Sequence, residues 1–438
     1  MAKSSSVRRF ARDTGKSLLL ILLCAVLGTG LLILSEFLPP EPMDRNLERS
    51  ADIFQATGKF PNLHTWCSSR LDNYSDAIML MMAGHVSAER PVEYAMLSYH
   101  PVMDDLDPVQ IIVKHYIDGA EYQEYEAYSR YWHGYGIIYR LLLQFTDYHR
   151  IRQLNTILQA GLILLLCVMM FRGGKRGKSM ILPLLISWGM LAPAVMGLNL
   201  EYSLGFYVSM LSVLTVLILH RKGRLREKEH LALLFSGICT AYWDVLTYPM
   251  AALGLPLAAA LCLEPDRKTL SSVARIVRLC FFWGLGYGVM WISKWGIGTL
   301  LTGFNVFEEG ISSFLLRTGD EAYGEAATAL GTIRSNLSYF LNTPVSFLLL
   351  ACILAAAVLL AVRTREKKLT LRAFGQKMIP FLIVALIPFA WCAVTKNHAG
   401  VHFWLASKGF IVSTMAILCG LAYAVTEDSP DAPAGGEV

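Results

Sequence analysis

The chain has 438 residues, of which 54% are hydrophobic and only 17% are charged, and its formal net charge is +5. Because a soluble domain usually carries nearer a quarter of charged residues, and because long apolar stretches recur, the composition excludes a soluble protein with a single tail. The basic residues lie in short clusters between apolar runs rather than on one patch, which argues against nucleic acid as a partner. The sequence therefore predicts an all-α polytopic membrane protein.

The N-terminus, residues 1–16, holds five basic residues and precedes an apolar run over 17–38. This run is too long for most signal-peptide cores and no small-residue cleavage site follows it, so we predict an uncleaved first transmembrane helix. With four later clusters, the N-terminus holds 24 of the 39 Lys and Arg residues. Placing all five clusters inside predicts both termini in the cytoplasm and a multi-pass protein of the plasma (inner) membrane. About ten spans follow, at 17–38, 154–171, 180–199, 204–220, 231–247, 249–263, 279–301, 342–362, 379–395 and 406–425.

The apolar region at 231–263 is 33 residues long, or about 50 Å as a single helix. A membrane core of about 30 Å cannot hold that length without a steep tilt, and both flanks are basic. Pro249 and Pro256 also oppose a continuous helix. We therefore expect the chain to go out and return, either as two short spans or as a re-entrant hairpin, with Asp244 near the outer face.

Two long segments should lie outside the membrane, at 39–153 and at 302–341. From residue 36 to residue 149 the chain holds 17 acidic residues and 8 basic ones. The bundle should occupy 154–425, and the polar end 426–438 is typical of a disordered tail. Nine cysteines are present without CxxC or Cys/His metal spacing, so neither a structural disulfide nor a metal site is predicted.

The stretch SRLDNYSDAIMLMMAG, residues 69–84, sets two carboxylates ahead of an apolar run that is too short to span. Asp72 and Asp76 are four residues apart and would share one face of a helix. Asn73 would be the N-cap of that helix and Asp76 its partner in a capping box. Asp72 is not needed for such a cap, and a carboxylate near apolar surface can act as a general base.

The aromatic stretch 128–155 contains His133 and Arg140 and should form an amphipathic helix at the outer interface, where Tyr and Trp are favoured. It serves either to anchor the loop or to bring His133 or Arg140 to a substrate. Further ionisable residues should lie at the same depth, namely Asp244, Lys294, Arg334, Lys396, His398, His402 and Lys408. Positive groups at this level suit a phosphate or pyrophosphate lipid, although Asp244 could equally form a buried polar contact and Lys294 could extend to the headgroups. His398 and His402 have metal-pair spacing, but no Glu follows in the zincin pattern.

The chain contains, in this order, one span, a large acidic outside loop, the aromatic run RYWHGYGIIYRLLLQF and then RIRQLNTILQAGLILLLCVMMFR. This order resembles the GT-C superfamily of multi-spanning glycosyltransferases, over the topology and about residues 17–175. The resemblance implies a polyprenyl-phosphate or pyrophosphate sugar donor, an Asp or Glu of the first loop as base, and basic residues that hold the donor phosphate. In that family the acid commonly follows the first span closely, as Asp44 does here, and a proline-rich run like KPPL before the second span is absent from this chain.

The sequence thus predicts a membrane glycosyltransferase that moves a sugar from a polyprenyl-phosphate donor to a lipid or cell-envelope glycan acceptor. Asp72 is the expected base and Asp44 the alternative, while Asp76 would orient the acceptor or a divalent ion, Mg²⁺ or Mn²⁺. Arg334, Lys396 and His398 would neutralise the leaving phosphate. A transporter or lipid flippase and a non-catalytic partner in envelope assembly remain the alternatives.

Overall fold

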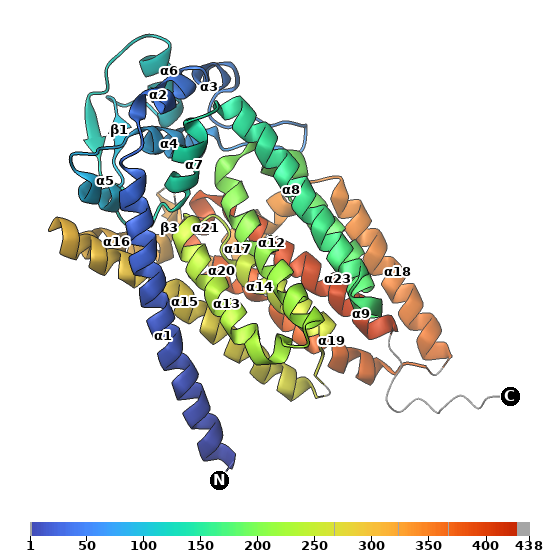
Figure 1. Cartoon of the computed structure of the whole chain (residues 1–438). Helices are drawn as coiled ribbons and strands as arrows, with labels where there is room; N and C mark the ends of the chain where they lie inside the picture. The colour runs from blue at the N-terminus through green and yellow to red at the C-terminus, as the bar shows by residue number, and fades with distance from the viewer. Residues whose placement is uncertain (1, 267, 323, 367, 427–438) are drawn as a thin grey trace.

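The computed structural model describes residues 2–266, 268–322, 324–366 and 368–426 (Figure 1). Within these ranges most of the chain is helical, and the strands form two short antiparallel pairs. Seven helices are long and apolar enough to cross a membrane, judged by length and composition. The prediction of an all-α polytopic membrane protein is therefore confirmed.

The first part of the chain forms one long helix and then a domain of short elements at one end of the molecule, which Figure 1 draws in blue and cyan. We call residues 36–147 the loop domain. Its two strands pair antiparallel, with His100 opposite Glu126. The elements are α1 (Ala2–Ser35), α2 (Pro40–Glu48), α3 (Ala51–Thr57), the 3-10 turn η1 (Cys67–Ser69), α4 (Asn73–Gly84), α5 (Pro91–Leu97), β1 (His100–Val102), α6 (Pro108–Tyr116), β2 (Glu124–Glu126) and α7 (Tyr135–Leu143).

The rest of the chain forms the helical bundle. Its elements are α8 (Tyr148–Phe171), α9 (Gly174–Ser179), α10 (Ile181–Met190), α11 (Pro193–Leu198), α12 (Leu200–Arg221), α13 (Leu225–Trp243), α14 (Met250–Leu263), α15 (Thr269–Thr302), α16 (Val306–Thr318), β3 (Glu321–Ala322), β4 (Glu325–Ala326), α17 (Ala329–Leu341), α18 (Val345–Arg365), α19 (Leu371–Ala385), α20 (Ile387–Val394), α21 (Lys396–Val401), α22 (Phe403–Ala406), the 3-10 turn η2 (Ser407–Phe410) and α23 (Ile411–Thr426).

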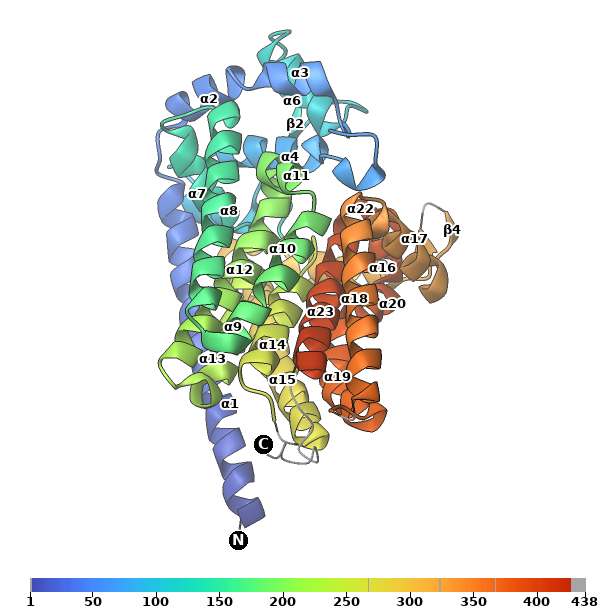
Figure 2. The same ribbon diagram turned by 90° about the vertical axis from the view of Figure 1, so that its right-hand side faces the viewer.

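Helix α14 forms the centre of the bundle and α18 part of its edge (Figure 2). Every residue of α14 is buried, as expected of a helix that is apolar on all sides and packed within a protein. No residue of α18 in the described part of the chain is buried, although α18 is also strongly apolar. The two helices are thus similarly apolar but have different surroundings, because α14 is enclosed by protein and α18 faces lipid.

Helices α13 and α15 pack closely because glycines face each other's backbone. A Cβ on Gly237 would lie 2.2 Å from the carbonyl oxygen of Trp283, and one on Gly286 would lie 2.3 Å from that of Leu234. Small residues at helix contacts are how membrane helices approach each other at close range. This contact aligns α13, whose C-terminus reaches the candidate site.

The N-cap of α4 differs from the prediction. Asp72, and not Asn73, is the N-cap, and its Oδ1 accepts a hydrogen bond of 2.9 Å from the Ser75 N–H. The predicted capping box of Asn73 and Asp76 is therefore wrong. The reason is tertiary, since the Asn73 amide donates to the Gly58 carbonyl and Asp76 bonds to another helix.

The predicted set of ten spans is not confirmed. The expected span 180–199 is divided into α10 and α11, where Ala192 has a φ of 54° and Pro193 begins the second helix. The expected hairpin at 231–263 is present as α13 and α14, separated at residues 244–249. The predicted tail 426–438 lies outside the described residues from 427 onward.

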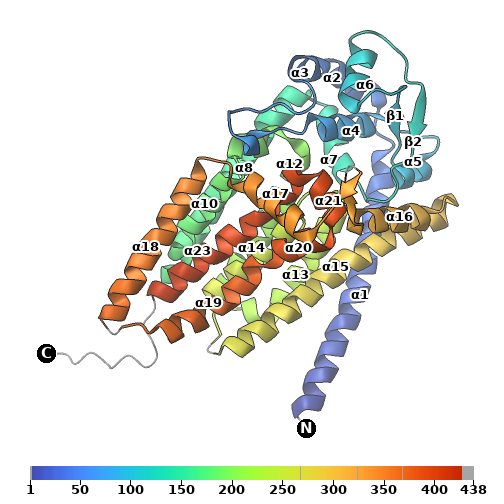
Figure 3. The same cartoon turned by 180° about the vertical axis from the view of Figure 1, so that it is seen from behind.

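The loop domain covers one end of the bundle, and the start of α1 lies at the opposite end, as does the end of α23 (Figures 1 and 3). Seen from behind in Figure 3, α16 lies across the end of α15 on the side of the loop domain. The second predicted outside segment, 302–341, is therefore at the same end of the molecule as the first. Which end faces the cytoplasm remains a prediction from charge.

Candidate functional site

Four segments meet in the interior at the end of the bundle nearest the loop domain: the N-termini of α4 and α12, the C-terminus of α13, and the stretch from α21 to η2. They bring together Asp72, Glu201, Asp244 and Lys408, whose exposed fractions are 1%, 4%, 3% and 4%. We call these four residues the buried cluster. The charges of Asp72 and Asp244 act on Glu201, and those of Asp72 and Glu201 act on Lys408. Three acids with one lysine in a membrane protein's interior are costly to keep, which makes this cluster the candidate functional site.

Asp72 is held from two sides. Its Oδ1 caps α4, and its Oδ2 accepts a hydrogen bond of 2.8 Å from the Trp404 indole N–H. Burial raises the pKa of Asp72 above its ordinary value of 3.8, while the bonds from Ser75 and Trp404 and the nearby Lys408 ammonium oppose that rise. A fixed carboxylate with increased proton affinity is suited to act as a general base.

The Lys408 ammonium lies over an aromatic ring, and no direct salt bridge joins it to any of the residues that the structure describes. Its Nζ lies 4.0 Å from the centroid of the Tyr202 ring, within the range of a cation–π contact. Tyr202 is fixed in turn, because the Tyr248 hydroxyl donates to its carbonyl oxygen at 2.5 Å. The ammonium therefore has a defined position while its hydrogens remain able to bind an anion.

Asp244 is positioned by the break between α13 and α14. Leu246 has a φ of 72°, an unusual conformation for a bulky residue and one found most often at functional sites. The Leu246 carbonyl accepts a hydrogen bond of 2.7 Å from His398 Nε2, so the lone pair of this histidine lies on Nδ1. Within the described residues, Asp244 Oδ2, Glu201 Oε2 and His398 Nδ1 are buried polar atoms without a hydrogen-bond partner. Each of the three therefore has hydrogen-bonding capacity that the described residues do not use.

Arg317 supplies a second cation from the other outside segment. Its Nη1 donates to His402 Nε2 at 3.2 Å, and burial lowers the pKa of His402 to about 4, with Arg317 adding to the shift. The charge of Arg317 also acts on His398, whose pKa burial lowers well below 6.5. Both histidines are therefore neutral at pH 7, and Arg317 is the charged member of this group.

Asp76 performs a structural task. It is fully buried and accepts hydrogen bonds from the backbone N–H groups of Leu200 at 2.9 Å and Glu201 at 3.1 Å, and from the Tyr148 hydroxyl. Burial raises the pKa of Asp76 to about 6 against the opposing effect of Arg152 and these bonds. A carboxylate at the N-terminus of α12 interacts favourably with the helix dipole, so Asp76 joins the loop domain to the bundle.

Three predicted site residues lie away from the buried cluster. Asp44 is exposed on α2, where it accepts a hydrogen bond of 2.8 Å from the Tyr116 hydroxyl. Arg334 is exposed on α17, and Lys396 pairs with the exposed Asp320. Of the two acids considered as base, only Asp72 belongs to the cluster.

His133, Arg140 and Lys294 are bound to the protein itself. His133 contacts the Tyr135 hydroxyl and the Tyr128 carbonyl, both at 2.8 Å. Lys294 is fully buried and donates to the Met96 carbonyl at 2.6 Å, so it does not extend to the headgroups. Trp132, in the same aromatic stretch, is also buried rather than an interface anchor. We assign these residues to the packing of the loop domain against the bundle.

Arg140 forms a buried ion pair that gives a testable prediction. Its Nη1 lies 2.6 Å from Glu36 Oε1 and donates to the Ser35 hydroxyl at 2.7 Å. Replacing Arg140 with Ala leaves Glu36 buried without its counter-charge, so we expect a loss of about 3–5 kcal/mol in the free energy of unfolding. Arg90→Ala breaks an exposed pair with Glu93 and should cost about 1 kcal/mol or less. Denaturant unfolding in detergent measures both, and equal losses would contradict the assignment.

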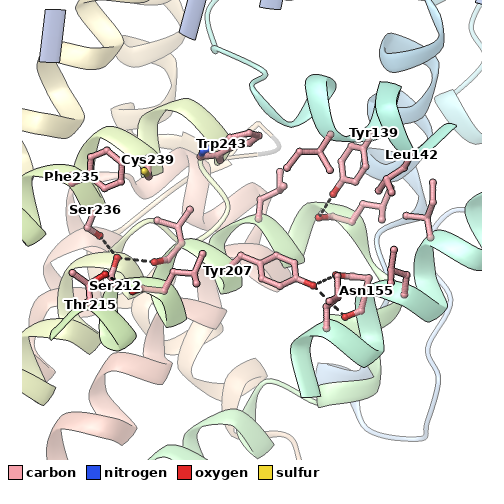
Figure 4. Close-up of a pocket in the computed structure, with 18 of the residues that line it drawn as sticks. Tyr139, Leu142, Asn155, Tyr207, Ser212, Thr215, Phe235, Ser236, Cys239 and Trp243 are labelled. Carbon is pink, nitrogen blue, oxygen red and sulfur yellow. Dashed lines mark hydrogen bonds between the residues drawn. The ribbon is translucent and has the colours of Figure 1, made fainter. Parts of the chain in front are cut away.

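An apolar groove of about 500 Å³ opens beside the cluster between α7, α8, α12 and α13 (Figure 4). Leu158, Leu211 and Phe235 line it and are each about half exposed on membrane-spanning surface. Its polar side chains bond to protein, as Tyr207 does to Asn155 Oδ1 at 2.7 Å and Ser212 to Ser236 at 2.8 Å. The groove therefore offers a ligand an almost wholly apolar wall. Leu200 and Trp243, the neighbours in sequence of Glu201 and Asp244, are among its lining residues.

The described residues contain no group of three or more His, Cys, Asp or Glu side chains that could hold a metal ion. His398 and His402 do lie together, with ring centroids 5.1 Å apart, but each has the protein partner given above.

Comparison with known proteins gives no relative: no family model, no curated protein and no solved structure matches this chain. The class shown by the fold is that of an integral membrane protein with an all-α bundle. A more specific assignment of function depends on the candidate site.

Glu201 and Arg317 are the site residues that sequence reasoning missed. Glu201 follows Asn199, the N-cap of α12, whose side chain accepts from the Tyr202 N–H. An acid two residues after a capping residue and ahead of an apolar run was a readable signal, but the predicted span began only at 204. Nothing in the sequence indicates that Arg317 rather than Arg334 belongs to the site, because this depends on how α16 and α17 pack.

Proposed function

We propose that this protein is a membrane glycosyltransferase that transfers a sugar from a polyprenyl-phosphate-linked donor to a lipid or cell-envelope glycan acceptor. The observation that carries the proposal is the buried cluster, in which the charge of Lys408 acts on the fixed carboxylate of Asp72 at the end of the bundle near an apolar groove. The excess of basic residues at the opposite end supports a loop domain on the outer face of the membrane.

In the proposed reaction, Asp72 takes the proton of an acceptor hydroxyl. The acceptor oxygen forms a bond to the anomeric carbon of the sugar, and the bond between that carbon and the donor phosphate breaks. The polyprenyl phosphate leaves with the electron pair, and the cations of Lys408 and Arg317 stabilise its charge. Glu201 Oε2 and Asp244 Oδ2 would accept hydrogen bonds from sugar hydroxyls.

The apolar groove supports a lipid-linked donor over a soluble one. A chain of isoprenoid units needs an apolar surface within the membrane, and the groove opens at that level between α8 and α13. Its volume of about 500 Å³ lies within the range of about 300–1,000 Å³ that is usual for ligand sites. Since Trp243 and Leu200 border the groove, a chain lying there would direct its sugar phosphate towards the buried cluster, where Lys408 supplies the positive charge.

The direct test uses the purified chain in liposomes with a radiolabelled polyprenyl-phosphate sugar and a mixture of envelope lipids and glycans as acceptors. We expect release of polyprenyl phosphate together with labelled product. Movement of intact donor across the bilayer without its cleavage would instead support a transporter. The break between α13 and α14, next to buried ionisable groups, is the observation that favours this second candidate. Failure to bind any lipid-linked sugar would favour the non-catalytic alternative.

The pH dependence of transfer tests the role of Asp72. Because burial raises the pKa of Asp72 above 3.8, activity should rise with pH as this carboxyl loses its proton, with a midpoint above 3.8. Lys408 opposes that rise, so Lys408→Met should move the midpoint to higher pH as well as lower the rate. The measurement is a profile of kcat/KM against pH for both proteins. A midpoint at or below 3.8, or one that Lys408→Met leaves unchanged, would contradict the role of the cluster.

A further inference from the structure

A second pocket, of about 850 Å³, lies at the end of the bundle opposite the loop domain. It is bounded by the end of α14, the first turn of α15, the middle of α19 and the end of α23. These helix ends belong to the side of the molecule where the basic clusters 172–178, 267–278 and 363–377 converge. The pocket is separate from the buried cluster and takes no part in the proposed transfer.

The pocket combines a basic rim with an apolar floor. Arg176, Lys268 and Lys377 line it from three separate segments of the chain. Leu261, Pro380 and Phe381 form apolar wall, and Leu261 and Phe381 are each 2% exposed.

Asp266 is the one carboxylate among the lining residues that the structure describes, and it is neutralised from outside the pocket. It lies 3.0 Å from Arg226 and 3.8 Å from Arg275. The first turn of α15 borders the pocket through Thr269 and Ser272, and its N–H groups add partial positive charge to that of the three side chains. In the described part of the chain, the lining thus has three cations above an apolar base. Arg176 also donates to the Leu263 carbonyl, and Lys377 lies over the Tyr423 ring.

We propose that this pocket binds the headgroup of an anionic phospholipid from the leaflet on the basic side of the membrane. The cations would hold the phosphate, and the apolar floor would contact the glycerol and the upper acyl chain. Basic pockets between helix ends on the cytoplasmic side are suited to such headgroups, and each Lys or Arg near the surface adds to the attraction. A free phosphate would make no use of the apolar floor, which is why the lining favours a lipid.

The experiment measures lipid binding to the purified full chain by native mass spectrometry in detergent, with phosphatidylglycerol as the probe and phosphatidylcholine for comparison. We expect the wild-type chain to retain phosphatidylglycerol at least about fivefold more tightly than phosphatidylcholine. Lys268→Ala/Lys377→Ala should lose about fivefold in affinity for each lysine removed. The matched control is Lys16→Ala/Lys222→Ala, which removes the same charge from exposed residues of other segments at this end and should bind as the wild type does.

Equal retention of the two lipids by the wild-type chain would overturn the proposal without the use of any variant. So would a loss in the control pair as large as that in the pocket pair, because general surface charge would then explain the binding. Displacement of phosphatidylglycerol by millimolar inorganic phosphate would show a site for a free anion and would also overturn it. Unchanged thermal unfolding of the lipid-free variants establishes that their folds are intact.

Discussion

Asp72→Asn is expected to lower the rate of sugar transfer by about 10²–10⁴-fold, the range that a general base contributes. Asn serves as an N-cap nearly as well as Asp, so α4 should keep its start. Its carbonyl oxygen can accept the bond from the Ser75 N–H that Asp72 now accepts. What the variant lacks is the negative charge that takes the acceptor proton. The measurement is single-turnover transfer in liposomes, with thermal unfolding recorded on the same preparation.

Asp44→Asn is the matched control, because it makes the same chemical change in the same domain on an exposed helix. Its transfer rate should stay within about twofold of the wild type. If Asp44→Asn abolished transfer while Asp72→Asn retained it, the base would be Asp44, as the family resemblance in its simplest form implies. If both variants kept full activity, neither acid would be the base.

Asp76→Ala is expected to lower the free energy of unfolding by about 3–5 kcal/mol, as much as Arg140→Ala. The substitution leaves the Tyr148 hydroxyl and the two N–H groups at the start of α12 buried without their acceptor, and removes the counter-charge of Arg152. Unfolding by denaturant in detergent micelles, followed by tryptophan fluorescence, measures the loss. The loop domain should detach from the bundle before the bundle unfolds.

The comparison for this prediction is Asp44→Ala, which loses one exposed hydrogen bond from Tyr116 and should cost about 1 kcal/mol or less. A similar loss in the two variants would show that Asp76 does not join the two parts of the molecule. Should Asp76→Ala remain as stable as the wild type but lose transfer, Asp76 would belong to the reacting site, the role first considered for it.

The placement of Asp72, Asp244 and His398 near one another could be foreseen from sequence because topology alone assigns their depth. Each lies at the outer end of an apolar run, and charge patterning assigns those ends to one side of the membrane. Depth alone does not determine which of these side chains contact one another at that side of the membrane. Asp44 and Arg334 lie at the expected end of the molecule but are exposed, because α2 and α17 turn those faces outward.

Tertiary contacts also determine side-chain partners that local sequence rules do not predict. The capping rule applied to residues 72–76 gave the wrong N-cap, since Asp76 instead binds the start of α12, some 124 residues away in sequence. His133 and Arg140 were reasonable candidates for substrate contacts because they are polar groups in an aromatic stretch. In the structure, however, His133 contacts the Tyr128 carbonyl, and Arg140 pairs with Glu36 at the end of α1. Such pairings are properties of the fold, and a single sequence does not contain them in readable form.

We propose that the buried cluster and the neighbouring groove together bind a lipid-linked sugar phosphate. The most direct test is an electron cryomicroscopy structure of the chain with a non-cleavable polyprenyl-phosphonate sugar. We predict the isoprenoid chain in the groove between α8 and α13, the phosphonate beside Lys408 and Arg317, and the sugar within hydrogen-bonding distance of Asp72. An analogue bound elsewhere on the protein, with the cluster and the groove unoccupied, would contradict the account.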